Sequence, residues 1–162
     1  MSGTLFYRTG LPFSVVDTLT PNFIGNGSSG SFLVDPLTPA VRNCGAAAIN
    51  TACLQLSQFP AAGSETTFAN STKNSYRGPG YFNTDFSLLK NFAITERIRF
   101  ALGANFFNVL NHPNFANPIS DINNGEFGKI IHTVVPPTSP YGAFVGSAVS
   151  GRQVQVTARF SF

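Results

Sequence analysis

The chain has 162 residues, about the length of one domain, and a formal net charge of +3. Only 10% of the residues are charged and the 10 Lys and Arg are scattered, so the clustered basic patch that nucleic-acid binding requires is missing. No run reaches the ~18 consecutive apolar residues of a membrane-spanning helix, and the first ten residues lack the features of a signal peptide. The 17 Phe, together with many Gly, Pro, Asn and Ser, are typical of a β protein with large loops.

The first predicted strand covers residues 3–13, where Leu5 and Tyr7 alternate with Thr4 and Arg8. A long connection, 17–79, follows and is rich in Gly, Ser and Pro. Connections of this length are uncommon in compact domains. We therefore expect this one either to carry function or to pack against another part of a larger protein.

Two cysteines, Cys44 and Cys53, lie in this connection. They would form a loop disulfide in an oxidising compartment, and two unpaired thiols are equally compatible with the sequence. Their spacing matches no metal motif, and His112 and His132 are far away along the chain. We therefore expect neither a metal nor another cofactor.

The second predicted strand covers residues 81–92. Its even-numbered positions are mostly apolar, as in Phe82 and Phe86, whereas its odd-numbered positions are mostly polar, as in Asn83 and Asp85. A period of 3.6 residues would mix the two kinds of residue on each face, so the pattern indicates a strand and not a helix.

The third predicted strand, 97–108, repeats this pattern with Arg97 and Arg99 on the polar face. Apolar residues must face each other across the hairpin, so the numbers of paired residues must sum to an even value. The turn must then contain an odd number of residues. We predict a three-residue turn, 94–96, which places Asn91 opposite Arg99.

A second long connection, 108–151, contains a short run, 127–135, that is compatible with a further strand. His112 lies in this connection among asparagines and could contact a ligand. We favour a turn instead, in which Asn111 and Asn114 form hydrogen bonds with local backbone.

The last predicted strand covers residues 152–162 and alternates without an error. Its polar face carries Arg159. Its apolar face consists of Val154, Val156, Ala158, Phe160 and Phe162.

Two architectures share this alternation. In a soluble secreted β-sandwich with a binding or adhesion role the apolar face would form a core, whereas in a transmembrane β-barrel it would contact lipid. The runs of about 10 to 12 residues approach the ~9–11 that cross a bilayer, and short and long connections alternate as in outer-membrane barrels. The polar faces then carry the possible lumen-facing residues Asp85, Arg97, Arg99 and Arg159. We predict an all-β fold in which about four main antiparallel strands form the terminal segment of a transmembrane β-barrel with long extracellular loops.

A set of short motifs lies between residue 77 and the end of the chain. GPGYFNTDFSLLK is followed by ER, FFNVLNH, FGKI and RQVQ, and the last residue is Phe. Together these motifs resemble the C-terminal part of Oar-like TonB-dependent outer-membrane receptors. The matching residues are Gly78, Pro79, Gly80, Asn83, Asp85, Ser87, Leu88, Lys90, Glu96, Arg97, Phe106, Phe107, Asn108, Asn111, His112, Phe127, Gly128, Ile130, Arg152, Gln153, Gln155 and Phe162.

The resemblance implies that residues 1–162 are the C-terminal fragment of a receptor barrel of about 22 strands, with a plug in its lumen. Such receptors take up or bind substrates through extracellular loops, and a TonB box couples them to the inner membrane. No plug, TonB box or signal peptide is recognisable in this sequence. The implied partners are the rest of the barrel, the plug, outer-membrane lipid and the barrel-assembly machinery, and the TonB complex only through missing parts. The implied location is the cell outer membrane.

The resemblance also implies an orientation in which the last strand runs inward and both long connections lie outside the cell. It further implies that the barrel-assembly machinery reads the apolar face of the last strand, ending in Phe162, as a sorting signal. Four strands cannot close a barrel, because single-chain barrels begin at about eight strands. The chain would therefore need the missing strands or self-association, for which a trimer would supply twelve.

We expect no enzymatic activity. The acidic residues Asp85, Glu96 and Glu126 belong to separate segments without a shared catalytic spacing, and no Ser-His-Asp motif is recognisable. The arginines of the polar faces could attract an anionic substrate. We favour their pairing with Asp85, with Glu96 or with carboxylates of missing strands.

Overall fold

A computed structural model of the chain describes residues 1–162 except 20–29, 46–47, 135–145 and 148–150. The regular elements in the described part are ten β-strands and one short 3₁₀ turn, η1 (Leu56–Gln58). No helix in this part is long and apolar enough to cross a membrane. The prediction of an all-β fold with antiparallel strands is confirmed.

The chain forms two compact units. Unit 1 consists of Met1–Arg8, Tyr81–Asn114 and Thr133–Phe162. Unit 2 consists of Thr9–Gly80 and Phe115–His132. The four long strands belong to unit 1, and the two long connections supply most of unit 2.

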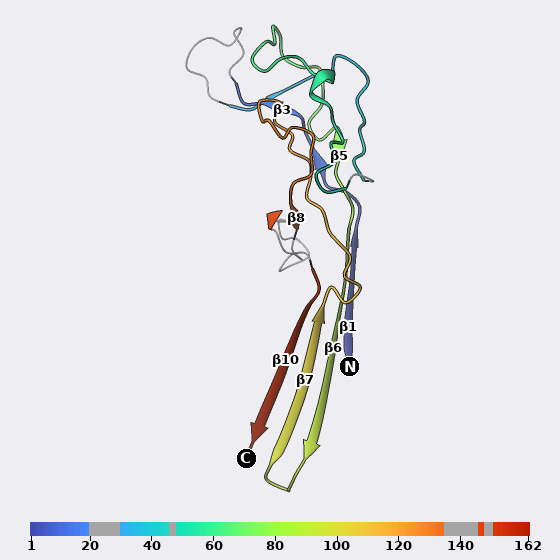
Figure 1. Ribbon diagram of the computed structural model, residues 1–162, viewed down its shortest axis with the longest axis vertical. Helices are drawn as coiled ribbons and strands as arrows, with labels where there is room; N and C mark the ends of the chain where they lie inside the picture. The colour runs from blue at the N-terminus through green and yellow to red at the C-terminus, as the bar shows by residue number, and fades with distance from the viewer. Residues whose placement is uncertain (20–29, 46–47, 135–145, 148–150) are drawn as a thin grey trace. The chain divides into compact units, whose positions relative to one another are not determined.

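Unit 1 is built on a four-stranded antiparallel sheet. Its strands, in order across the sheet, are β1 (Ser2–Arg8), β6 (Tyr81–Ala93), β7 (Arg99–Phe107) and β10 (Gln153–Ser161). Figure 1 shows them side by side, with the C-terminus near the β6–β7 turn and the N-terminus about halfway along β6, where Ser2 faces Ser87. In the same unit β8 (Thr133–Val134) pairs with β9 (Gly146–Ser147), so only the last part of the predicted run 127–135 is a strand.

The register places the apolar residues of the four strands on one face. Phe86 faces Phe106 and Phe92 faces Phe100 between β6 and β7, and Phe160 faces Phe100 between β10 and β7. The rings of Phe100 and Phe160 lie 4.6 Å apart between centroids, and those of Phe92 and Phe100 lie 5.9 Å apart. Cross-strand aromatic pairs of this kind stabilise a sheet by a few tenths to about 1 kcal/mol each. The predicted pairing of apolar with apolar residues is therefore present.

The β6–β7 turn is longer than predicted. Asn91 faces Ala101 and Ala93 faces Arg99, so five residues and not three connect the strands. The backbone N–H of Ile94 donates to the carbonyl of Ile98 (3.0 Å), and the Ile98 N–H donates to the Thr95 hydroxyl (3.1 Å). The prediction of a three-residue turn is wrong. Turns of three and of five residues both pair apolar with apolar positions, so the alternation cannot choose between them. The hydrogen bonds of Ile94, Thr95 and Ile98 favour the longer turn.

The first strand is shorter than the sequence pattern. β1 ends at Arg8, and the rest of the predicted segment 3–13 belongs to unit 2, where β2 (Pro12–Phe13) pairs with β5 (Tyr76–Arg77). Pro12 lacks an N–H group and therefore suits the edge of a short ribbon better than the interior of a long strand.

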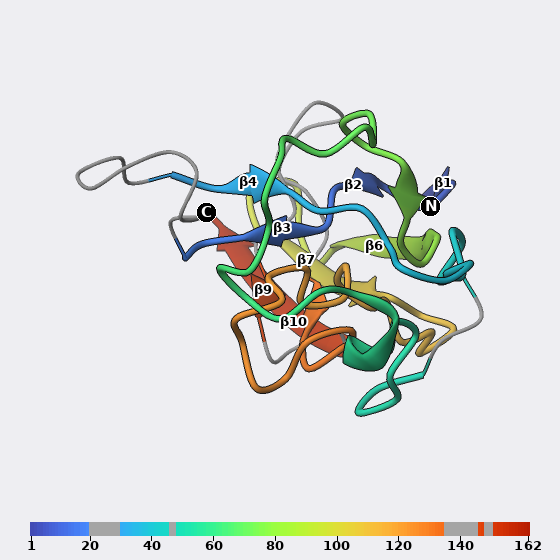
Figure 2. The same cartoon turned by 90° about the horizontal axis from the view of Figure 1, so that it is seen from above.

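Unit 2 has its own apolar core. A second short ribbon pairs β3 (Val16–Asp17) with β4 (Phe32–Leu33), and Figure 2 shows these two strands next to each other. The ring of Phe59, from the first long connection, packs edge-on against Phe127, from the second, at 5.2 Å between centroids. The core residues are Phe13, Val15, Val34, Cys44, Leu54, Phe59, Tyr76, Ile122 and Phe127. Both long connections therefore fold together instead of running as open loops.

A disulfide joins Cys44 to Cys53 at the edge of this core, with 5.6 Å between the Cα atoms. Cys44 is buried and Cys53 packs partly against the same cluster. The Cys53 N–H also donates to the carbonyl of Gly128 (2.9 Å). The disulfide thus fixes a segment of the first connection beside the second.

Candidate functional site

The polar face of the unit 1 sheet carries two exposed arginines near the β6–β7 turn. Arg159 of β10 lies opposite Ala101, and Arg99 of β7 lies opposite Ser161. The two arginines therefore occupy diagonal positions on neighbouring strands, a spacing of about 7–8 Å. Arg97 lies outside β7, within the turn, so it does not share this position on the strands.

Asp85 lies at the opposite end of the same face and does not pair with these arginines. Its Oδ1 accepts hydrogen bonds from the side-chain amide of Asn83 (2.8 Å) and from the backbone N–H of Asn108 (2.9 Å). In the part of the chain that the structure describes, neither Arg99 nor Arg159 forms an ion pair with Asp85 or Glu96. The favoured pairing with Asp85 or Glu96 is therefore not formed among the described residues, and pairing with carboxylates of missing strands stays a prediction.

The segment after β7 is held by asparagine side chains. Asn108 and Asn111 adopt positive φ angles of 49° and 53°, which asparagine tolerates better than most residues. The Asn108 amide donates to the carbonyl of His112 (2.8 Å) and accepts from its N–H (3.0 Å), which closes a tight turn. The predicted turn around His112 is present, and Asn108 is the residue that the sequence interpretation missed.

Asn114 bonds to local backbone, as predicted, because its side-chain amide donates to the carbonyl of His112 (3.5 Å). Asn111 and Asn114 also bond to distant backbone, which the sequence did not predict. The Asn111 Oδ1 accepts from the N–H of Arg152 (3.0 Å), just before β10. The Asn114 side chain accepts from the N–H of Phe82 (2.8 Å) and donates to its carbonyl (2.9 Å). These two asparagines therefore tie the end of β7 to the beginnings of β10 and β6. Sequence spacing carries no signal for partners 32 and 41 residues away.

The last strand is exposed along its whole length. Val154, Val156, Ala158 and Phe160 share the apolar face, as the alternation predicts, and Phe162 follows the end of β10. Among the described strands β10 pairs only with β7, and β1 pairs only with β6. The sheet thus has two free edges whose backbone groups are available to further strands.

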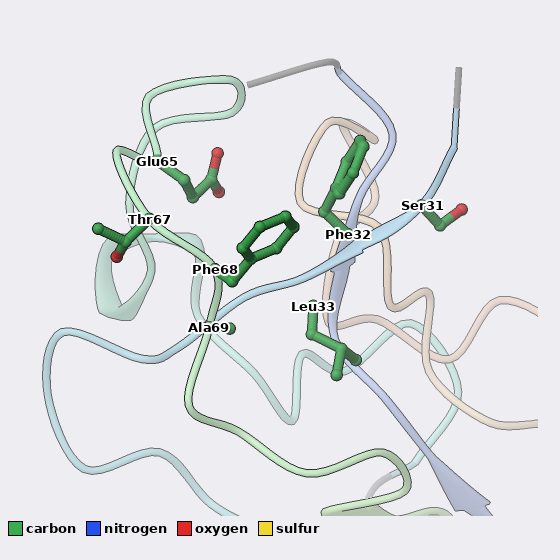
Figure 3. Close-up of a pocket in the computed structure, with 7 residues that line it drawn as sticks. All are labelled: Ser31, Phe32, Leu33, Glu65, Thr67, Phe68 and Ala69. Carbon is green, nitrogen blue, oxygen red and sulfur yellow. The ribbon is translucent and has the colours of Figure 1, made fainter. Parts of the chain in front are cut away.

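Unit 2 contains a cavity of about 230 Å³ between β4 and residues 65–69. Figure 3 shows the Phe68 ring extending from residues 65–69 toward Phe32 of β4, with the Glu65 carboxyl reaching inward from the same segment as Phe68. Phe68 is 72% exposed although it is a large apolar residue. Neither Glu65 nor Phe68 belongs to a periodic pattern, so the sequence interpretation did not select them.

Buried carboxyl groups organise the chain around this cavity. Asp17 is 0% exposed and accepts hydrogen bonds from the N–H groups of Leu19 (2.8 Å) and Gly63. The pKa of the Glu65 carboxyl is raised, first because burial disfavours its charge and also because Asp17 is close.

Asp35 shows the opposite behaviour. It accepts hydrogen bonds from the Ser71 hydroxyl and from the N–H groups of Asn70 (2.7 Å) and Ser71 (2.7 Å). These bonds, the Ser71 hydroxyl first, hold the pKa of Asp35 below its ordinary value. No three His, Cys, Asp or Glu residues in the described ranges lie close enough together to hold a metal ion.

The comparison with known families gives one match. The family model described as "Outer membrane beta barrel domain" matches residues 1–155 of the chain. The chain belongs to this family of outer-membrane barrels. No curated protein and no solved structure matched it.

Membership of the outer-membrane barrel family explains the two faces and the two free edges of the sheet. A barrel strand alternates between apolar and polar residues and pairs with a neighbour on each side. The chain is thus a segment of an outer-membrane β-barrel, located in the outer membrane, and not a soluble β-sandwich. The family suggests a role in transport or structure.

Proposed function

We propose that the chain is part of the barrel of an Oar-like TonB-dependent receptor and takes part in substrate uptake or surface binding, without enzymatic activity. The observation that carries this proposal is the four-stranded sheet, in which β6, β7 and β10 overlap the receptor-like motifs between residue 77 and Phe162. The match to an outer-membrane barrel family over residues 1–155 supports the assignment to an outer-membrane barrel.

The apolar face of the sheet contacts lipid in this proposal and the polar face lines the lumen. Apolar side chains such as Val156, Phe160 and Leu102 are exposed and are not buried within unit 1. Contact with lipid would remove them from water. Asp85, Arg99 and Arg159 then face water or a plug, since a charge on the lipid face would cost about 2–4 kcal/mol near the midplane. Arg97 is near the same lumen, in the turn.

The free edges of β1 and β10 pair with further barrel strands, because unpaired edges are not tolerated in hydrocarbon. These strands come from the rest of the receptor. The apolar face of β10, ending in Phe162, is recognised by the barrel-assembly machinery. A plug and a TonB contact belong to parts of the receptor outside the four strands.

Orientation and TonB coupling are tested in separate experiments on the full-length protein in cells. The first uses Gly125→Cys, in unit 2, and Thr95→Cys, in the β6–β7 turn. A membrane-impermeant maleimide should label the Gly125→Cys variant on intact cells and the Thr95→Cys variant only after permeabilisation, since in this proposal the second long connection lies outside the cell and the turn lies in the periplasm. Labelling of the turn variant alone on intact cells would contradict the orientation.

The second experiment measures cross-linking of the full-length protein to TonB in cells. A TonB-dependent adduct that strengthens with substrate supports the receptor assignment. An outer-membrane protein with the expected labelling but no TonB adduct would leave the barrel intact and overturn the receptor. Cross-linking of the 162-residue chain alone in detergent adds one further control: a ladder that ends at three copies would indicate a trimer of four-stranded protomers, and a monomer would exclude it.

A further inference from the structure

The polar face of the unit 1 sheet contains a hollow beside the two arginines. Its volume is about 590 Å³, within the range of about 300–1,000 Å³ that is usual for small-molecule pockets. The side chains used below are Leu89, Asn91, Arg99, Thr157, Arg159 and Ser161, all of which line it. We call this hollow the arginine basin.

The register explains why the arginine basin is hollow. Asn91, Ala101 and Arg159 form one row across β6, β7 and β10, and the neighbouring row on the same face contains Ala93, Arg99 and Ser161. Gly103 sits in the row on the other side of Ala101. On this face β7 therefore contributes only the hydrogen of Gly103 and the methyl group of Ala101 at two successive positions. The longer side chains of β6 and β10 surround these two positions.

Gly103 is also closely surrounded. A Cβ atom at this position would lie 2.6 Å from the Thr157 hydroxyl and 3.3 Å from Cδ1 of Leu89. These two side chains therefore cover the glycine and form one wall of the basin. A glycine is therefore required at position 103, because a larger side chain would overlap Thr157 and Leu89.

The charge of the arginine basin is positive and uncompensated within the described part of the chain. Arg99 and Arg159 both line it, and neither guanidinium group forms a hydrogen bond or ion pair with a described residue. Asp85, the acidic residue on the same face of β6, is engaged by Asn83 and Asn108 at the far end of the strand. Two planar guanidinium groups on diagonal positions can each bind a carboxylate through two parallel hydrogen bonds.

We propose that the arginine basin binds a small organic acid with two carboxylate groups. The two guanidinium groups take one carboxylate each, and the amide of Asn91 and the hydroxyls of Thr157 and Ser161 supply neutral hydrogen bonds around them. Leu89 offers an apolar surface to the carbon chain between the carboxylates. The proposal depends on the sheet and its register, and it does not depend on TonB coupling.

The test is calorimetric titration of the full-length protein in detergent with glutarate, which carries two carboxylates. Saturable binding is expected for the wild type. The R99Q/R159Q double variant should bind at least about ten-fold more weakly, since it loses charge-assisted hydrogen bonds. The matched control is Arg97→Gln, which removes an arginine from the adjacent turn and should leave the affinity unchanged.

Two further measurements separate the site from general charge effects. Ala101→Leu keeps both arginines and fills the floor of the basin, so it should also abolish binding, and its folding is checked by heat-modifiable gel mobility. Glutaramide, the neutral analogue with the same chain length, should not bind. The proposal is overturned if wild type does not bind glutarate, if the double variant or Ala101→Leu binds it equally well, or if inorganic phosphate binds as tightly as glutarate.

Discussion

The side-chain amide of Asn114 forms two hydrogen bonds with the backbone of a single residue, Phe82. Oδ1 accepts from the Phe82 N–H at 2.8 Å, and Nδ2 donates to the Phe82 carbonyl at 2.9 Å. Asn114 thus occupies the place that a residue of a paired strand would take beside β6. Its side chain is 2% exposed, so the bonds are shielded from water.

Replacing Asn114 with Ala should lower the free energy of unfolding by about 2 kcal/mol, because a buried N–H and a buried carbonyl lose their partners. Chemical unfolding of the full-length protein in detergent, followed by circular dichroism, measures this. Asn114→Asp keeps the acceptor but not the donor and should be intermediate. Asn70→Ala is the matched control, since Asn70 is exposed. Equal stability of Asn114→Ala and Asn70→Ala would show that the two bonds add nothing.

The strands of unit 1 could be predicted because their side chains alternate and because neighbouring strands must agree in parity. Those constraints give the faces of β6, β7 and β10 correctly. They do not give the length of the turn, since adding two residues preserves every face. The choice of five residues depends on the Thr95 hydroxyl and the Ile94–Ile98 bond, which are local interactions without a periodic signal.

The core of unit 2 could not be predicted in the same way. Leu54, Phe59 and Ile122 are buried, but they lie in irregular chain where burial follows no fixed spacing. The contact between Phe59 and Phe127 joins two connections that are separated along the chain by β6, β7 and the turn between them. Contacts of this kind join residues far apart along irregular chain, and a single sequence carries no periodic signal for them.

Deleting Phe162 or replacing it with Asp should reduce the amount of the full-length protein in the outer membrane. The physical reason is that the apolar face of β10 ends in this aromatic residue, and a charge there would disfavour insertion. Quantitative blotting of outer-membrane fractions, with heat-modifiable mobility as the measure of folding, checks the prediction. Phe162→Tyr keeps the ring and should assemble normally. If the Phe162→Asp variant reaches the outer membrane at the wild-type level, Phe162 has no role in assembly.

Gly128→Ala should destabilise unit 2 strongly. Gly128 has φ +75°, which costs an L-residue about 1–2 kcal/mol, and a Cβ atom would also overlap the backbone carbonyl of Leu54. Limited proteolysis of the protein in outer-membrane vesicles should therefore cut unit 2 of the variant at lower protease concentration. Gly125→Ala is the control three residues away, because open space surrounds that position. Equal resistance of both variants would mean that the Gly128 conformation relaxes freely.

Removing the disulfide by Cys44→Ala and Cys53→Ala should lower the stability of unit 2 by about 2–3 kcal/mol, as the chain-entropy relation gives for a loop of about ten residues. The protease sensitivity of the wild type should rise when a reductant is added. The double variant should be sensitive without the reductant and should not respond to it. A wild type that resists protease equally with and without reductant would show that the core holds Cys44 and Cys53 in place by itself.

The stability of unit 2 should depend on pH through Glu65. Burial first, and the neighbouring Asp17 second, raise its pKa above the ordinary value of 4.5, so the folded unit favours the protonated, neutral carboxyl. The stabilising contribution is therefore complete below pH 4.5 and is lost as the pH rises through the raised pKa. Asp17 faces Glu65 and accepts from Leu19 and Gly63, so a charged Glu65 would repel it and loosen the segment around residue 63.

Glu65→Gln separates this effect from other titrations, because glutamine has nearly the same shape and stays neutral. Protease resistance of unit 2, measured between pH 4 and pH 8 with a protease that is active over this range, should fall with rising pH in the wild type. It should fall less in Glu65→Gln. Glu126→Gln is the matched control, since Glu126 is exposed and bonds Lys129 at 2.7 Å, and it should keep the pH dependence of the wild type. If Glu65→Gln keeps the full pH dependence of protease resistance, another group titrates. The contact between Glu65 and Asp17 then does not control the stability of the segment around residue 63.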